Sequence, residues 1–318
     1  MVSTVKLQQA IEEFLNACHA DGLRPPTVKW YQQKLSMFRA ATTAESLEQI
    51  RLADMRAYIS GLYNRDHRLV GDANNKRKQA GKLSIATMRG HIRMLRRFWA
   101  WSVKEYRLKT NPMDGIQMPR EGQAGPKAIS NSDARKLLLA CEDGTVIGLR
   151  NKAMIAFLLD TGCRAGGLLG LQPHNLNLVD RRAQLVEKGN KARLVGFSEY
   201  TAQAIAAWME ARPTNTEFVF CSLGSKPWGR LTGAGLHRML SETAQKAGIS
   251  GRYNAHSFRH AFARRYIRAG GDVSTLTKLM GHSSSAITTQ VYAVFMVEEA
   301  LQAYEKIDLM GRLLSEEE

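Results

Sequence analysis

The chain has 318 residues, of which 44% are hydrophobic and 23% charged, the proportions of a globular protein with room for two domains. No apolar run approaches the roughly 20 residues that span a bilayer, and the N-terminus shows no signal peptide, so we expect a cytoplasmic protein without a membrane partner. Four scattered cysteines without a CxxC pair indicate reduced thiols and argue against a zinc site or a disulfide framework.

The net charge of +16 is the first indication of function. A surplus this large favours a polyanionic partner, most simply nucleic acid, which in a prokaryotic host would place the protein at the nucleoid. The same charge also fits a basic protein with no such partner, so motifs along the chain must decide.

The first third of the chain is expected to be helical. Two prolines precede Thr27, a predicted helix N-cap, and the apolar residues after it fall at helical spacing. The basic segment 64–82 has no periodicity, and we interpret it as a loop. A further helix, within 83–108, carries arginines largely off its apolar stripe. A solvated helix face and a phosphate-binding face explain these arginines about equally well. The candidate DNA-binding residues here are Lys76, Arg77, Lys78, Arg89, Arg93, Arg96 and Arg97.

A linker is expected where the helical pattern stops. Asn111-Pro112 ends the helix, and residues 119–128 mix Pro, Gly and charge without periodicity. We therefore predict one domain over 1–118 and a second over 129–318. The second is mostly helical, except for apolar residues on both sides of Gly189-Asn190, which indicate a β-hairpin. The expected fold class is mainly α with a small antiparallel β-sheet.

Six residues of the second domain have the chemistry for attack on a phosphodiester without a metal. Two guanidiniums can hold the non-bridging oxygens, a lysine can protonate the leaving oxygen, and a histidine can move the nucleophile's proton. A tyrosine can then store the phosphate as an ester. No acidic cluster suits two Mg²⁺ ions and no GxxxxGK[ST] loop is present, so we expect no cofactor. The six are Arg164, Lys188, His256, Arg259, His282 and Tyr292.

Taken singly, each of these residues also has an ordinary structural interpretation. Arg164 fits a capping or salt-bridge residue, and the two histidines fit packed side chains. Lys188 and Lys191 fit solvent-facing charges of a hairpin, with Lys191 the alternative if the register differs by a few positions. Near this hairpin, Lys191 and Arg193 are also candidate DNA-binding residues.

In order and type, the six residues resemble the tyrosine recombinases, the phage integrase and Xer group. Four segments resemble that family's catalytic boxes: TGCR, EKGNKARLV, AHSFRHAFA and LMGHSSSAITTQVY. In the N-terminal half, TVKWYQQKLSMF and LRRFWAWSVKEYRLKTNP resemble the family's helical, SAM-like core-binding domain. Any one box is a weak signal, but four in order are specific.

The resemblance implies a site-specific DNA recombinase and a role for each residue. Arg164 and Arg259 would clamp the scissile phosphate, Lys188 would be the general acid, His256 would transfer a proton, His282 would bind a phosphate oxygen, and Tyr292 would be the nucleophile of a 3′-phosphotyrosyl intermediate. Family members clamp duplex DNA, assemble as tetramers on two core sites and exchange strands through a Holliday junction. The resemblance implies the same for this chain, in integration, excision or resolution of a mobile element, and leaves room for accessory DNA-bending proteins.

The ends of the chain carry two further expectations. The core-binding pattern begins almost at once, so we expect an Xer- or Cre-like architecture without an arm-binding domain. The amphipathic stretch after Phe295 is expected to be an exchange helix that packs on a neighbouring protomer, the alternative being a helix that packs on its own chain.

The sequence departs from the family pattern at two places. Gly166 and Gly167 stand where the family usually has an acidic residue that orients the first arginine, and Asp160 or Glu187 could substitute for it. The interval from His282 to Tyr292 is ten residues, one longer than usual, and we expect the SSSA loop to absorb the difference.

Two other functions compete with recombination. A type IB topoisomerase-like enzyme would share the chemistry but act alone. A DNA-binding relative with impaired catalysis would be consistent with the paired glycines, although the retained Tyr292, Arg259 and Lys188 argue against it.

Overall fold

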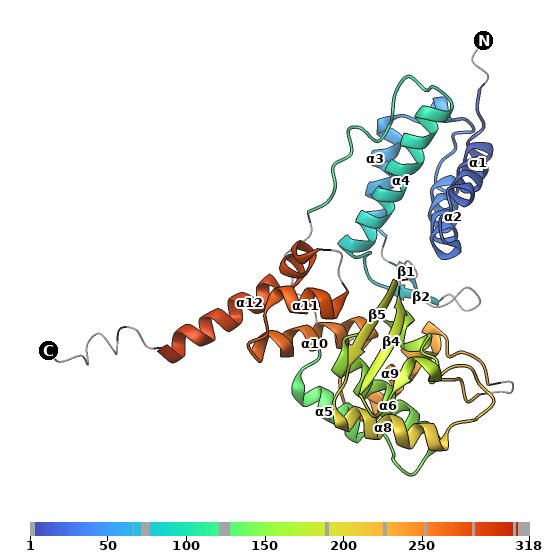
Figure 1. The fold of residues 1–318 in the computed structure, drawn as a ribbon. Helices are drawn as coiled ribbons and strands as arrows, with labels where there is room; N and C mark the ends of the chain where they lie inside the picture. Colours follow the sequence, from blue (N-terminus) through green and yellow to red (C-terminus); the bar gives the residue numbers. More distant parts are fainter. Residues whose placement is uncertain are drawn as a thin grey trace. The chain divides into compact units, whose positions relative to one another are not determined.

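The computed structural model describes residues 4–65, 67–70, 77–120, 128–187, 191–224, 228–250, 253–281, 284–307 and 310. The chain divides into two compact units, Met1–Gln123 and Ala124–Glu318 (Figure 1). Each unit has a hydrophobic core of its own. The division falls inside the segment 119–128. Within the described residues, no helix is both long enough and apolar enough to cross a membrane.

The N-terminal unit is built on helices with an aromatic core. Phe14 lies edge-on to Phe98 with ring centroids 5.5 Å apart, and Trp99 is fully buried beside them. Ser84 starts the longest of these helices, since its side chain accepts a hydrogen bond from the backbone N–H of Thr87. The helical elements are α1 (Leu7–Ala20), α2 (Pro25–Arg39), η1 (Leu47–Gln49), α3 (Leu52–Tyr63) and α4 (Ile85–Glu105).

Two local expectations for this unit are wrong. Helix α2 begins at Pro25 with Arg24 as its N-cap, and Thr27 lies inside it. Proline suits the first helical position because its missing N–H would have no partner there. The segment 64–82 contains an antiparallel pair of strands, β1 (His67–Val70) and β2 (Arg77–Ala80), instead of a loop. Backbone pairing alone defines such a ribbon, so it needs no alternating apolar pattern.

The C-terminal unit is organised around α6 (Val146–Thr161), which packs against α8 (Glu199–Ala211) and α10 (Ala255–Arg268). The stretch AMIAFLLD lies on this central helix, and nearly all of its side chains are buried. The other helical elements are α5 (Asn131–Leu139), α7 (Ala165–Leu169), η2 (Pro173–Asn175), α9 (Gly233–Lys246), α11 (Val273–Met280) and α12 (Ser285–Ile307).

A three-stranded antiparallel sheet completes this unit, in the order β3 (Leu176–Asn177), β4 (Arg182–Glu187) and β5 (Lys191–Gly196). The pairing of β4 with β5 confirms the hairpin expected on the two sides of Gly189-Asn190, while the turn itself, 188–190, lies outside the described residues. The mainly α fold with a small antiparallel sheet is the fold class expected from the sequence.

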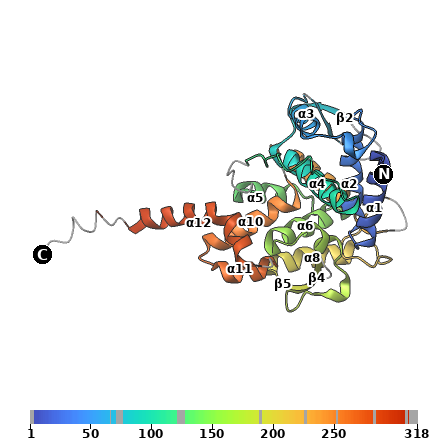
Figure 2. The same ribbon diagram turned by 90° about the horizontal axis from the view of Figure 1, so that it is seen from above.

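The C-terminal helix begins against α10 and α11 and then leaves them. In both views of the ribbon, α12 extends away from the rest of its unit (Figures 1 and 2). Gly281 ends α11 in the left-handed conformation, with φ of 61°. The expectation that the SSSA loop absorbs the extra residue stays a prediction, because 282–283 lie outside the described residues.

Candidate active site

A tight turn at the end of α6 positions Arg164. Gly162 ends the helix with φ of 56°, and a Cβ atom there would lie 2.6 Å from the ring of Phe262, so glycine is required twice over. Two residues later Arg164 is the N-cap residue of α7, with its side chain 38% exposed. Its guanidinium can therefore still meet a ligand at the surface.

The acidic partner of Arg164 is Glu187, at the end of β4. One carboxylate oxygen, Oε2, accepts from Nη1 of Arg164 in an ion pair, and the other, Oε1, accepts from the Arg164 backbone N–H at 3.2 Å. Oε1 also lies 2.9 Å from Nη2 of Arg193. Burial by itself raises the pKa of Glu187, but the charges and hydrogen bonds of the two arginines outweigh it and hold the pKa below its ordinary value. The carboxylate is therefore ionised at neutral pH.

Asp160, the other acid considered for this role, serves elsewhere. Its Oδ2 accepts from the backbone N–H of Ser198 at 2.5 Å and from Oγ1 of Thr201 at 2.9 Å, so it stabilises the start of α8. Of the two acids proposed from the sequence, Glu187 is the one that contacts Arg164.

Arg259 is the buried arginine of the site and is 2% exposed. Its Nη1 donates to the carbonyl of Gly162 at 2.8 Å, and its Nη2 donates to the carbonyl of Met280. The side chain thus joins the turn after α6 to the end of α11. Burial, and then the nearby charge of Arg164, lowers the pKa of Arg259 to about 10, so the guanidinium remains charged at neutral pH.

Two histidines lie one turn apart on α10. Asn254 caps the helix, because its Oδ1 accepts from the backbone N–H groups of His256 and Ser257, both at 3.0 Å. The His256 ring lies edge-on to the His260 ring, with centroids 4.3 Å apart. Burial, followed by the charges of Arg259 and Arg164, lowers the pKa of His256 below its ordinary value. His256 is therefore neutral at pH 7.

Tyr292 enters the site from α12 and is 1% exposed. Its Oη lies 3.2 Å from Nδ1 of His260, and its ring stacks on Phe295. Burial raises the pKa of Tyr292 to about 12, although the charges of Arg259 and Arg164 act in the opposite direction. The motifs did not single out His260, but its place four residues after His256, on the same helix face, could have indicated it.

Lys188 and His282 lie outside the described residues. The residues just before them, Glu187 and Gly281, are described and lie together. A Cβ atom on Gly281 would be 3.6 Å from Oε2 of Glu187. Glu187 and Gly281 therefore lie side by side, next to Arg164. Of the six predicted residues, the structure brings together Arg164, His256, Arg259 and Tyr292.

Comparison with known proteins identifies the family to which this arrangement belongs. The profile of the Phage integrase family matches residues 127–298. The chain belongs to the phage integrase family. The tyrosine recombinase XerC of Actinobacillus succinogenes is 31% identical over 216 residues, which are 67% of this chain and 71% of that protein. The tyrosine recombinase XerD of Listeria monocytogenes is 27% identical over 301 residues, 90% of this chain and 94% of that protein. The resemblance read from the four boxes is confirmed, and the protein is a tyrosine recombinase, an enzyme of site-specific DNA recombination.

Solved integrase structures share the fold of this tyrosine recombinase. The Tn1549 transposon integrase in complex with a circular intermediate DNA has a TM-score of 0.73 at 17% identity, over 95% of this chain and 100% of that chain. A lambda integrase tetramer bound to a Holliday junction has a TM-score of 0.69 at 17% identity, over 89% of this chain and 79% of that one.

The basic residues predicted to bind DNA fall into distinct structural groups. Arg89 donates to the carbonyl of Pro119 at 2.6 Å and Arg96 to that of Ile116 at 2.5 Å, so both hold the segment after α4. Arg193 is also engaged internally, with its side chain 10% exposed between Glu187 and the carbonyl of Leu279. The structure describes no side chain for Lys76, Arg77, Lys78 or Lys191.

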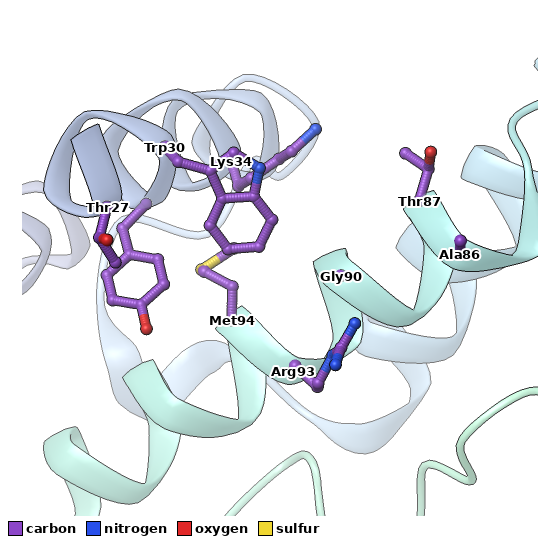
Figure 3. Close-up of a pocket in the computed structure, with 9 residues that line it drawn as sticks. Thr27, Trp30, Lys34, Ala86, Thr87, Gly90, Arg93 and Met94 are labelled. Carbon is purple, nitrogen blue, oxygen red and sulfur yellow. The ribbon is translucent and has the colours of Figure 1, made fainter. Parts of the chain in front are cut away.

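Arg93 and Arg97 have surface positions in the recombinase's N-terminal unit. The guanidinium of Arg97 lies over the ring of Tyr31, 5.7 Å from its centroid. Arg93 lines a surface pocket of about 540 Å³ between α2 and α4, together with Trp30 and Lys34 (Figure 3). A Cβ atom on Gly90 would lie 3.3 Å from the Trp30 ring, so glycine lets the indole lie close against α4. This pocket combines two cations with an aromatic ring, a combination suited to nucleic acid.

Proposed function

We propose that the protein cleaves duplex DNA at a specific site by attack of Tyr292 on a phosphodiester, and that it rejoins the strand to a different partner. The observation that supports this most is the phenol of Tyr292 beside His260, next to the arginines of two separate catalytic boxes.

The proposed chemical step is a transesterification. The Oη of Tyr292 forms a bond to phosphorus while the bond from phosphorus to the 5′ oxygen breaks, which leaves a 3′-phosphotyrosyl ester and a 5′ hydroxyl. Arg164 and Arg259 would hold the non-bridging oxygens, whose charge grows in the transition state. Because Arg259 is charged at neutral pH and buried, its effect on that charge is large.

Two proton transfers accompany this step. We infer that Nδ1 of His260 accepts the phenol proton, since it already lies 3.2 Å from the oxygen that must lose it. His256, neutral and edge-on to His260, is the neighbouring group to which the proton can pass. Lys188 would donate a proton to the leaving 5′ oxygen, and His282 would bind a phosphate oxygen, as the family resemblance implies.

Assembly is proposed to control access to the nucleophile. A phenol that is 1% exposed reaches a phosphate only after α12 has shifted. Beyond Phe295 this helix carries Val297, Leu301 and Tyr304, each more than half exposed and spaced for one face. We propose that this face packs on a neighbouring protomer in a tetramer on two core sites, with strand exchange through a Holliday junction. Integration, excision or resolution of a mobile element would be the biological outcome.

A nicked duplex tests the nucleophile. A binding site selected from random duplexes is synthesised with a nick near the cleavage position, and covalent protein–DNA adducts are resolved on denaturing gels in the presence of EDTA. Wild type should form an adduct, Tyr292→Phe should not, and Tyr304→Phe, an exposed tyrosine on the same helix, should match wild type. An adduct with Tyr292→Phe, or none with wild type, contradicts the proposed chemistry.

A plasmid with two copies of the selected site separates recombination from topoisomerase activity. Recombinant products are expected from wild type. Relaxed plasmid without recombinants would indicate a type IB topoisomerase-like enzyme instead.

A further inference from the structure

The carboxylate beside Arg164 comes from Glu187, on strand β4. A residue at position 167 on α7, the helix that Arg164 caps, is a second place from which a carboxylate could reach Arg164. On α7, a Cβ atom at Gly167 would lie 3.5 Å from Oε1 of Glu187 and 3.5 Å from Cβ of Leu185, ordinary van der Waals distances. The backbone of Gly167 does not need glycine, because its φ is not in the left-handed region. A side chain at 167 would therefore enter the space that the Glu187 side chain fills.

We propose that Glu187 is the positioning residue for Arg164, so that the carboxylate usual on α7 in this family is supplied here from β4, opposite Gly167. This inference rests on the proposed function and deepens it. The presence of glycine at 167 and of glutamate at 187 has one common explanation. Glycine at 167 removes the usual partner and leaves room, and the buried glutamate fills that room with the same functional group.

Glu187 also connects Arg164 to the remaining parts of the site. Its Oε1 is 2.9 Å from Nη2 of Arg193, and Nη1 of Arg193 donates to the carbonyl of Leu279 near the end of α11. The next carbonyl along, that of Met280, accepts from Arg259. One buried carboxylate thus holds in register the start of α7, the β4–β5 hairpin and the end of α11.

Loss of this carboxylate has a definite electrostatic consequence. Arg164 and Arg193 would become two adjacent cations without a shared anion, and Arg193 has little freedom because its side chain is 10% exposed. Arg164, 38% exposed, is the one that would move. A guanidinium displaced by about 1 Å from the phosphate costs on the order of 10²-fold in rate.

Moving the carboxylate back to the helix tests this assignment. Single-turnover adduct formation on the nicked duplex is measured for wild type, Glu187→Ala, Gly167→Glu/Glu187→Ala and Gly167→Ala/Glu187→Ala. We expect Glu187→Ala to lose about 10²-fold, the Gly167→Glu double variant to recover most of that loss, and the Gly167→Ala double variant to recover none. Both double variants replace a helical glycine, so the comparison isolates the carboxylate from helix propensity.

Two further controls complete the experiment. Glu142→Ala removes an exposed glutamate that pairs with Lys246 at 3.2 Å, and it should match wild type. If Glu187→Ala fails to fold, Glu187→Gln replaces it, which keeps the volume and removes the charge, and the same loss is expected.

The outcomes distinguish this inference from the proposed function. If wild type cleaves and Glu187→Ala cleaves equally fast, or if both double variants recover to the same extent, the positioning role is wrong and the function stands. If wild type forms no adduct, the proposed function fails and the role of Glu187 in it fails as well.

Discussion

The Nδ1 atom of His260 lies 3.2 Å from the Oη atom of Tyr292, in a site where both side chains are buried. Burial raises the pKa of this phenol to about 12, so at neutral pH the phenol keeps its proton until a base accepts it. The ring of His260, within hydrogen-bond distance of that oxygen, is placed to do so.

Replacement of His260 by alanine should therefore slow cleavage and change its pH dependence. We expect a loss of about 10²- to 10⁴-fold at pH 7, the usual contribution of a general base. In the variant the phenol must ionise unaided, so the rate should keep rising as the pH approaches the Tyr292 pKa of about 12. Single-turnover adduct formation between pH 6 and 10 measures this, with the exposed His237→Ala as control. A variant profile parallel to that of wild type would show that His260 does not take the proton.

Gly162 should be the most sensitive glycine of the active-site turn. An alanine there would adopt a φ of 56° and place its Cβ 2.6 Å from the Phe262 ring, while displacing the carbonyl that accepts from Arg259. We expect Gly162→Ala to lower the free energy of unfolding by about 2–4 kcal/mol. Gly166→Ala is the matched control, since nothing lies within 4 Å of a Cβ there, and it should be neutral or slightly stabilising. Urea denaturation measures the stability of both variants, and equal unfolding midpoints for Gly162→Ala and Gly166→Ala would contradict the expectation.

The stability of the N-terminal unit should depend on pH through His91. Burial, then the charges of Lys34 and Arg65, lowers the pKa of His91 to about 4, while the unfolded chain has the ordinary value of 6.5. Below pH 6.5 the unfolded state therefore binds a proton that the folded state does not. The stability present above pH 6.5 is lost as the pH falls toward 4, by about 3 kcal/mol at 1.4 kcal/mol per pKa unit.

Urea denaturation of wild type and His91→Gln between pH 7 and 4 measures this effect. The glutamine can still bond the Tyr58 hydroxyl, which lies 3.5 Å from Nδ1 of His91, but it cannot titrate. Its stability should fall less steeply over this range, and identical slopes for the two proteins would assign the pH dependence to other groups.

The candidate catalytic residues could be proposed from the sequence because the proposed chemistry depends on residue types in a fixed order. TGCR and AHSFRHAFA contributed Arg164 and Arg259. In the structure Arg259 donates to the carbonyl of Gly162, two residues before Arg164, and Arg164 pairs with Glu187. The hairpin was predictable for a local reason, since short apolar segments flank the Gly189-Asn190 pair in the sequence.

The missing details depend on contacts between elements, which no local pattern encodes. That Glu187 and not Asp160 pairs with Arg164 follows from the packing of α7 on β4. Arg96 and Arg193 were predicted to bind DNA, yet each donates to a backbone carbonyl that folding brings within reach. Arg96 remains exposed, whereas the side chain of Arg193 is 10% exposed. A count of charges does not reveal such contacts.

A difference in role between two neighbouring arginines can be tested in the N-terminal unit, where Arg93 and Arg96 lie one turn apart on α4. Arg93 lines the pocket with Trp30 and Lys34, whereas Arg96 donates to the carbonyl of Ile116 (Figure 3). If Arg93 contacts a phosphate, Arg93→Ala should weaken DNA binding for every sequence and reduce the slope of log affinity against log salt by about 0.9. Arg96→Ala should leave that slope unchanged and instead lower the free energy of unfolding by about 1 kcal/mol, the ordinary contribution of a hydrogen bond. Fluorescence anisotropy over a salt series, with urea denaturation of the same proteins, measures both quantities. The opposite pattern would mean that DNA binding breaks the Arg96 contact and that the pocket faces away from DNA.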